Sequence, residues 1–165
     1  APDLATALGG REPDRVVDVT PTDLRAARDL LTTAVGDRLD VVSLGTPHYS
    51  VAELGRLTEL LGDRRVHPDV ALYASTGRDV LREVELRGWV ARLEAAGVRL
   101  VVDTCTYVTP IIDSDARTAM TDSAKWAYYA PGNLGLEVAF GSTEDCVESA
   151  VAGRVVRDEG IWAGA

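Results

Sequence analysis

Five apolar runs of the sequence end in glycine or small hydroxylic residues, with reactive side chains beside those ends. The segments that follow the runs are residues 45–48, 75–78, 103–105, 121–125 and 141–142, and Cys146 comes one helical turn later. They contribute His48, Arg78, Cys105 and Lys125. Thiols suit a soft iron or iron–sulfur site, and arginine suits a carboxylate or phosphate. This pattern predicts an anion-binding site with thiol ligands, but two thiols cannot hold a cluster without a ligand from elsewhere.

Each of these residues also has an ordinary structural explanation. Ser142 and Thr76 can cap helices, His48 and His67 can be hydrogen-bonded loop residues, Cys146 can be a small buried apolar residue, and Asp122 can form a surface ion pair with Lys125. Zinc is disfavoured, because neither histidine lies at a usual ligand spacing. The hydrolase elbow, the Walker loop and the dinucleotide fingerprint are absent. It is the convergence of these residues on strand ends that favours a site.

Strand-like and helix-like patterns alternate along the chain. Strand-like apolar runs cover residues 16–19, 39–44, 70–74, 98–102, 118–120 and 136–140. Helical spacing or capping boxes predict helices over 20–35, 50–61, 78–96 and 142–151, with one or two helical turns at 123–130 before Pro131. Apolar strands without polar alternation, each followed by a helix, predict a three-layer α/β/α fold with a mostly parallel sheet. Ligands of such sheets bind at the carboxyl ends of the strands, where the reactive residues fall.

Length and composition indicate one globular domain. The chain has 165 residues, 46% of them hydrophobic, and a net charge of −9, which disfavours nucleic acids and anionic membranes as partners. No apolar stretch approaches a membrane span, and two cysteines make no disulfide framework, so we expect a cytoplasmic protein. Residues 1–14 are interpreted as a linker or frayed end, 15–157 as the α/β domain and 158–165 as a tail.

The same segments carry a resemblance to a known family. Residues 43–48 (SLGTPH), 75–78 (STGR), 103–105 (DTC), 120–125 (MTDSAK), 130–132 (APG) and 140–147 (FGSTEDCV) resemble, in this order, the catalytic domain of aconitase X. The resemblance runs from about residue 16 to 154. Members of the family include cis-3-hydroxy-L-proline dehydratase and the large subunit of phosphomevalonate dehydratase. The resemblance implies an aconitase-like fold and part of an iron-dependent hydro-lyase that removes water from a small anionic β-hydroxy acid.

The resemblance also implies roles for individual residues. Cys105 and Cys146 look like ligands of an iron–sulfur cluster (4Fe-4S or 2Fe-2S) or of a mononuclear iron. His48, Ser123 and Lys125 look catalytic, with His48 assisting the departing hydroxyl. The residues that would contact the substrate are Thr46, Ser75, Thr76, Arg78, Gly141 and Ser142. One departure is Asp122, where the family leads us to expect asparagine.

Length is the larger departure from the family. The chain resembles only the C-terminal portion of the catalytic domain, and lacks the N-terminal catalytic portion and the small swivelling subunit or domain that the resemblance implies as partners. We therefore expect this chain alone to be incomplete and inactive. The alternative from another class is a non-catalytic α/β module that binds an anion or serves in assembly. A hydroxyproline and a phosphorylated hydroxy acid both remain open as substrates, with the arginine-rich composition favouring the former.

Overall fold

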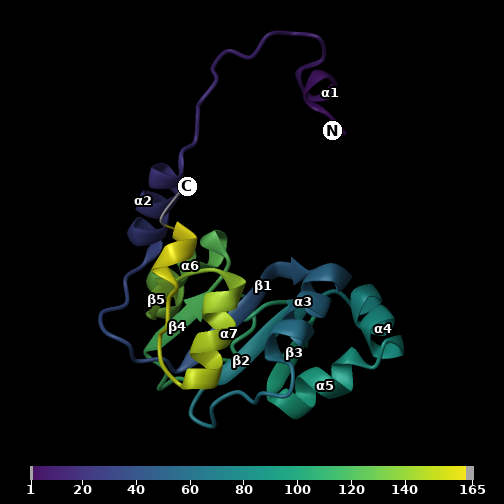
Figure 1. The fold of residues 1–165 in the computed structure, drawn as a ribbon, viewed down its shortest axis with the longest axis vertical. Coiled ribbons are helices and arrows are strands. Elements are labelled where there is room, and N and C mark those ends of the chain that lie inside the picture. Colours follow the sequence, from purple (N-terminus) through teal and green to yellow (C-terminus); the bar gives the residue numbers. More distant parts are fainter. Residues whose placement is uncertain (1, 163–165) are drawn as a thin grey trace.

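The computed structural model describes residues 2–162, and the body of the fold is a five-stranded sheet (Figure 1). The strands are β1 (Val41–Tyr49), β2 (Ala71–Thr76), β3 (Val98–Val102), β4 (Thr118–Thr121) and β5 (Glu137–Phe140). All neighbouring strands pair in parallel, in the order β3-β2-β1-β4-β5. The chain builds outward from β1 in both directions, so the strand order reverses between β1 and β4. Open α/β sheets place their ligand crevice at such a reversal point.

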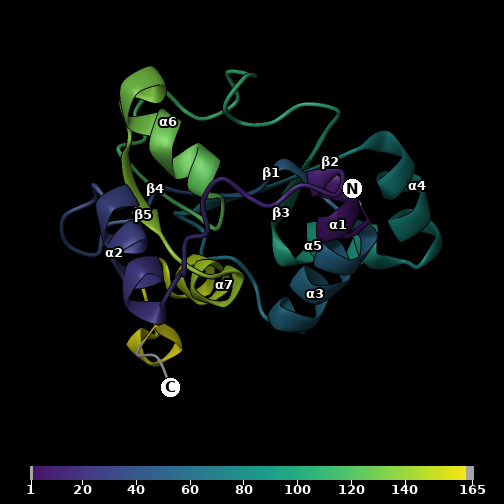
Figure 2. The same ribbon diagram turned by 90° about the horizontal axis from the view of Figure 1, so that it is seen from above.

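Helices cover both faces of the sheet and confirm the predicted three layers (Figure 2). One face packs against α3 (Val51–Leu61), α5 (Trp89–Ala96) and α7 (Thr143–Ala152), with α4 (Arg78–Leu86) beside α3 and α5. The other face packs against α6 (Ala124–Leu134), and α2 (Pro21–Leu31) lies at the β5 edge against α6. The short elements α1 (Leu4–Leu8) and η1 (Glu159–Trp162) lie near the two ends of the described chain. None of the described helices is long and apolar enough to cross a membrane.

Each face of the sheet has its own apolar core, because alternate side chains of a strand point to opposite faces. Val42 and Leu44 of β1 pack with α3 and α7, whereas Val41 packs with Trp126 of α6. Fully buried Leu54 and Leu57 dominate the first core. The helix starts follow the predicted capping boxes, and both reciprocal bonds are present at Thr20, Ser50 and Ser142. The rigid sheet and capped helices fix where the loops at the carboxyl edge begin.

Three elements differ from their predictions. The helix predicted over 78–96 is two helices, because Gly88 adopts a left-handed conformation (φ 71°) between α4 and α5. The turns predicted for 123–130 form a longer helix that runs past Pro131 to Leu134, one turn beyond the proline, and ends at left-handed Gly135. The apolar run at 16–19 is not a strand, since its valines are 62–75% exposed and it pairs with no described strand.

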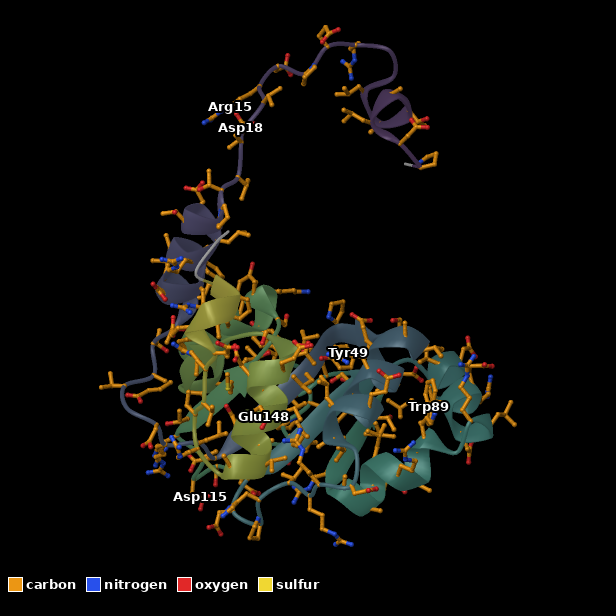
Figure 3. The ribbon with its side chains drawn as sticks, viewed as in Figure 1. Arg15, Asp18, Tyr49, Trp89, Asp115 and Glu148 are labelled. Carbon is orange, nitrogen blue, oxygen red and sulfur yellow. The ribbon has the colours of Figure 1, made fainter. Side chains whose placement is uncertain are left out.

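Residues 2–19 extend away from the sheet (Figure 3, with Arg15 and Asp18 labelled). The predicted linker 1–14 thus contains the short helix α1, capped by Asp3. Ala1 and residues 163–165, which belong to the predicted linker and tail, lie outside the described residues. The globular body therefore begins near α2.

Candidate functional site

A cavity of about 370 Å³ opens at the carboxyl edge of the sheet, on the α6 side. Its walls come from the end of β1, the loop after β3 and the first turns of α6. They consist of Thr46, Pro47, His48, Asp103, Thr104, Cys105, Tyr107, Val108, Lys125, Trp126 and Tyr129. A smaller hollow of about 150 Å³ shares Thr46, Pro47 and His48 with it and reaches Asp122 and Ser123. The structure thus brings together four residues predicted from the sequence: Thr46, His48, Cys105 and Lys125.

Residues 45–48 reach the cavity because β1 leaves its register there. Leu44 pairs with Ala74, but the next pair is Tyr49 with Thr76, so the residues between them bulge out of the ladder. Gly45 makes this possible: its φ is 73°, and a Cβ built on it would lie 2.4 Å from the Ser75 carbonyl oxygen. The Thr46–Pro47 peptide bond is cis. The bulge places His48, which is exposed, at the cavity wall.

Ser123 joins this bulge to α6. Its hydroxyl donates to the Thr46 carbonyl oxygen at 2.8 Å and accepts the Trp126 backbone N–H at 3.3 Å, as the N-cap of the helix. Lys125 lies two residues further on, at the cavity wall, and is exposed. Among the described residues Lys125 has no ion-pair partner, and the ion pair considered for Asp122 and Lys125 is not formed. Lys125 is therefore a cation free to meet an anionic ligand.

Arg78 differs from Lys125, because its charge is already matched by Asp103. The Arg78 backbone N–H donates to Asp103 Oδ1 at 2.9 Å, and its Nε donates to Oδ2. These bonds, the backbone one foremost, lower the pKa of the Asp103 carboxyl. Asp103 holds a left-handed conformation (φ 58°) that is uncommon outside glycine. Asp103 lines the cavity and Arg78 does not.

Asp122 lines the smaller hollow, just after the end of β4. It accepts hydrogen bonds from the Tyr49 hydroxyl and, at 2.9 Å, from the Thr143 hydroxyl. Burial raises the pKa of the Asp122 carboxyl despite these two bonds. Burial, and next the Asp122 charge, raise the pKa of the Tyr49 hydroxyl. This group ties β1, β4 and α7 together (Tyr49 is labelled in Figure 3).

The two thiols occupy different surroundings. Both cysteines are free; Cys105 is 9% exposed and lines the cavity, whereas Cys146 is fully buried in the core between the sheet and α7. Burial raises the pKa of the Cys146 thiol well above its usual range. No three His, Cys, Asp or Glu side chains among residues 2–162 are grouped to hold a metal ion. The described residues alone therefore do not fit an iron centre, and Cys105 is the thiol that faces the cavity.

The ends of β2 and β5 make mostly structural contacts. Thr76 donates to the Tyr49 carbonyl oxygen at 2.9 Å, and Ser142 caps α7. A Cβ on Gly141 would lie 2.8 Å from the Met120 methyl carbon. Ser75 is fully buried, and its hydroxyl, like that of Thr46, has no hydrogen-bond partner in the described part of the chain. Of these predicted substrate contacts only Thr46 lines the cavity.

Two features were missed in the sequence. The first is the aromatic wall of Trp126, Tyr107 and Tyr129. Residues 126–129 (WAYY) were interpreted only as helical turns, although three aromatic residues in four were a usable signal.

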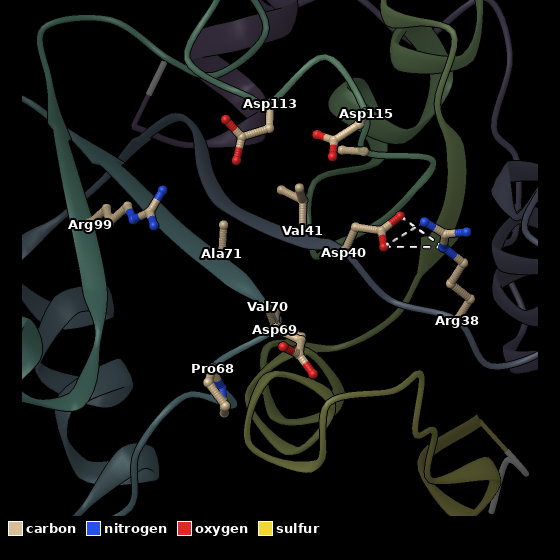
Figure 4. A pocket seen from close by; sticks show the side chains of 11 residues that line it. Arg38, Asp40, Val41, Pro68, Asp69, Val70, Ala71, Arg99, Asp113 and Asp115 are labelled. Atoms are coloured by element: carbon tan, nitrogen blue, oxygen red, sulfur yellow. Dashed lines mark hydrogen bonds and ion pairs between the residues drawn. The ribbon is translucent and has the colours of Figure 1, made fainter.

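The second is a hollow of about 230 Å³ at the opposite edge, near the amino ends of β1 and β2 (Figure 4). Its charged residues are Arg38, Asp40, Asp69, Arg99, Asp113 and Asp115. Asp40 there accepts the backbone N–H groups of Arg117 and Thr118, so it holds β4 in place.

Comparison with known proteins identifies the family. Residues 39–152 match the family described as the aconitase X third domain. The chain is 47% identical over 156 residues to a cis-3-hydroxy-L-proline dehydratase of Pseudomonas aeruginosa, covering 93% of this chain and 27% of that protein. It is 34% identical over 124 residues to the phosphomevalonate dehydratase large subunit of Methanothermobacter thermautotrophicus, covering 75% of this chain and 30% of that protein.

A solved structure supports the same assignment. The crystal structure of Thermococcus kodakaraensis aconitase X in its holo-form superposes with a TM-score of 0.68 at 26% identity, over 78% of this chain and 33% of that one. This chain thus spans about a quarter to a third of the length of these relatives. The chain belongs to the aconitase X family, and the part of that family it matches is the third domain.

Proposed function

We propose that this chain forms one wall of the active site of a hydro-lyase that removes water from a small anionic β-hydroxy acid. The observation that carries the proposal is the cavity at the strand-order reversal, where His48, Lys125 and Cys105 meet. The names of the relatives, cis-3-hydroxy-L-proline dehydratase and phosphomevalonate dehydratase large subunit, support this class of reaction.

Loss of water from such an acid requires three tasks: the carboxylate is held, the neighbouring proton is removed, and the departing hydroxyl is protonated. Lys125 is the unpaired cation at the cavity and would hold the carboxylate. His48 would protonate the departing hydroxyl, and the unpartnered Thr46 hydroxyl would bond a substrate oxygen. Ser123, predicted as catalytic, would act by holding the bulge that carries His48, since its single O–H donor is already bonded to the Thr46 carbonyl oxygen. The base would come from outside this chain.

The cavity favours a hydroxyproline-like substrate over a phosphorylated one. A phosphate group calls for several cations, but Asp103 neutralises Arg78 and adds a carboxylate to the wall. Lys125, the unpaired cation of the described cavity wall, matches a single carboxylate. Tyr107, Trp126 and Tyr129 offer an apolar surface for a ring. The higher identity to the hydroxyproline enzyme points the same way.

Cys105 is the one residue of this chain that we propose as an iron ligand. We expect its thiolate to be one ligand of an iron or iron–sulfur centre in the complete enzyme, where such a centre would supply Lewis-acid polarisation of the leaving hydroxyl. The other ligands would come from the N-terminal portion. Cys146 was predicted as a second ligand, but its place in the core gives that role no support. The small swivelling subunit or domain would complete the assembly, and two free cysteines suit a reducing compartment such as the cytoplasm.

The ligand assignment is tested by iron content. In the complete enzyme, Cys105→Ala is expected to lower bound iron and the visible absorbance, while Cys146→Ala, the matched loss of a thiol, leaves the iron content unchanged. Metal analysis on purified, folded variants decides between them. Equal iron in Cys105→Ala and the parent enzyme would remove Cys105 from the ligand set.

The anion-binding role is tested by kinetics in the complete enzyme with cis-3-hydroxy-L-proline. Lys125→Ala is expected to raise KM about tenfold to a hundredfold, the effect of losing a charge-assisted hydrogen bond. Arg92→Ala, which removes an exposed cation from α5, serves as the control and should leave KM unchanged. A KM for Lys125→Ala equal to that of the control would instead favour the alternative of a non-catalytic assembly module.

A further inference from the structure

A group of buried hydrogen bonds runs inward from the cavity wall at Trp126, and these bonds have no part in the proposed chemistry. The hydroxyls of Ser43 and Thr106 are 2.6 Å apart, and Trp126 Nε1 donates to Thr106 Oγ1 at 3.0 Å. All three residues are buried, with exposures of 0%, 1% and 1%. They come from β1, from the loop after β3 and from α6. The group therefore joins the three elements that form the cavity.

The chemistry of the three side chains makes Thr106 the centre of the group. The indole N–H of Trp126 can only donate, so Thr106 Oγ1 must accept from it. The Ser43 and Thr106 hydroxyls form one hydrogen bond with each other, in which either oxygen can be the donor. Valine at position 106 would fill the same space but leave the buried indole N–H without an acceptor, a costly arrangement. Serine would keep both bonds.

The loop that Thr106 anchors also carries the cavity thiol. Cys105 precedes Thr106, and its carbonyl oxygen accepts the N–H groups of Val108 and Thr109 at 3.1 and 3.0 Å. The hydroxyls of Thr104 and Thr109 meet at 2.6 Å. Residues 104–109 thus form a compact turn closed on itself. Of its side chains, Thr106 is the one bonded to both the sheet and α6.

We infer that Thr106 is a positioning residue that holds Cys105 at the cavity wall, through its bonds to Ser43 and Trp126. Of the three elements that it joins, the loop is the one without a strand ladder or a helical hydrogen-bond pattern of its own. Its next bonds to the body are made at Tyr107, by Asn133 of α6, and at Ile111, by Tyr73 of β2. Both lie beyond Thr106 in the sequence, so loss of the Thr106 hydroxyl loosens the part of the loop where Cys105 lies, while β1 and α6 stay in place. The inference concerns the placement of the thiol and does not depend on which reaction the complete enzyme catalyses.

The exposure of Cys105 provides the measurement. In this chain, which has an apolar core on each face of its sheet, an aromatic disulfide reagent should label Cys105 in the native state, while fully buried Cys146 reacts only on unfolding. Thr106→Val is expected to raise the native labelling rate of Cys105 about tenfold, by easing local opening. Thr106→Ser should restore the parent rate, and Cys105→Ala identifies the fast-reacting thiol.

Thr58→Val is the matched control. Thr58 is 4% exposed, and its hydroxyl donates to the Leu54 carbonyl oxygen at 2.8 Å within α3, on the other face of the sheet. It should leave the labelling rate within about twofold of the parent. The inference fails when Thr106→Val labels at the parent rate, or when Thr58→Val accelerates labelling as much. Should Thr106→Val not fold, Ser43→Ala removes one of the two bonds; an unchanged rate in that folded variant also overturns the inference.

Discussion

Pairing, more than residue type, decides which charges at the carboxyl edge can act on a ligand. Arg78 and Lys125 are both cations near the edge, but Asp103 binds Arg78 while Lys125 has no ion-pair partner in residues 2–162. Asp122 accepts hydrogen bonds from two hydroxyls and forms no ion pair with a described residue. A carboxylate bonded only by neutral donors keeps most of its desolvation cost, which is why burial raises its pKa. The ionised form of Asp122 is therefore disfavoured by its buried position.

The unfavourable ionisation of Asp122 can be tested by replacing it and measuring how stability depends on pH. The folded-state pKa of Asp122 is raised, so its protonated form favours folding, and this stability is lost as pH rises through the folded pKa. Asp122→Asn keeps an oxygen that can accept from Tyr49 and Thr143 but cannot ionise. We expect the free energy of unfolding of Asp122→Asn, minus that of the parent, to increase from pH 4 to pH 8 in urea titrations. Asp113→Asn, at an exposed carboxylate, should show no comparable increase.

The bulge of β1 is the element on which the cavity depends. Its four residues leave the ladder between two register pairs, and Ser123 and Thr76 hold its two ends by hydrogen bonds to Thr46 and Tyr49. Gly45 allows the bulge because its backbone is left-handed and lies against β2. The geometry of His48 thus depends on a residue with no side chain.

Gly45→Ala should destabilise the chain by about 3 kcal/mol, because the new methyl meets the Ser75 carbonyl oxygen and strains the backbone. Gly77→Ala is the matched control at the end of the neighbouring strand. The φ of Gly77 is −86°, and no atom lies within 4 Å of a Cβ placed there. Gly77 is the N-cap of α4, where alanine is less favourable than glycine, so we expect a cost of about 1 kcal/mol or less. Chemical denaturation measures the free energy of unfolding of both variants. Similar losses in the two would show that the bulge does not require glycine at position 45.

The sequence predicted the elements better than their contacts. Apolar runs and capping boxes are local signals, so five strands and the starts of α2, α3 and α7 follow from it. The break at Gly88 was missed because an interior glycine reads equally as a tolerated helix residue. The valines at 16–19 were misleading, since a strand needs a partner that periodicity cannot reveal. The pairing of Arg78 with Asp103, and the burial of Cys146, depend on residues far away in the sequence.

At the largest scale, residues 2–162 form a globular body and an extended N-terminal segment. Both cores and the cavity are built from residues after 20. In residues 2–19 every described side chain is exposed except that of Leu8, which is half-buried. Within residues 2–162, no hydrogen bond joins this segment to the body. The segment therefore contributes little to the stability of the body.

Limited proteolysis separates the two parts. Trypsin should cut first after Arg11 and Arg15, which are exposed in the extended segment, and leave a fragment that begins at Val16. The melting temperature of that fragment is expected to stay within about 2 °C of the intact chain, because no core contact is removed. Leu57→Ala, at a fully buried position, shows the sensitivity of the measurement: a cost of about 2–5 kcal/mol should lower the melting temperature by about 5–15 °C. A fragment that melts as early as Leu57→Ala would mean that the segment packs on the body and supports its fold.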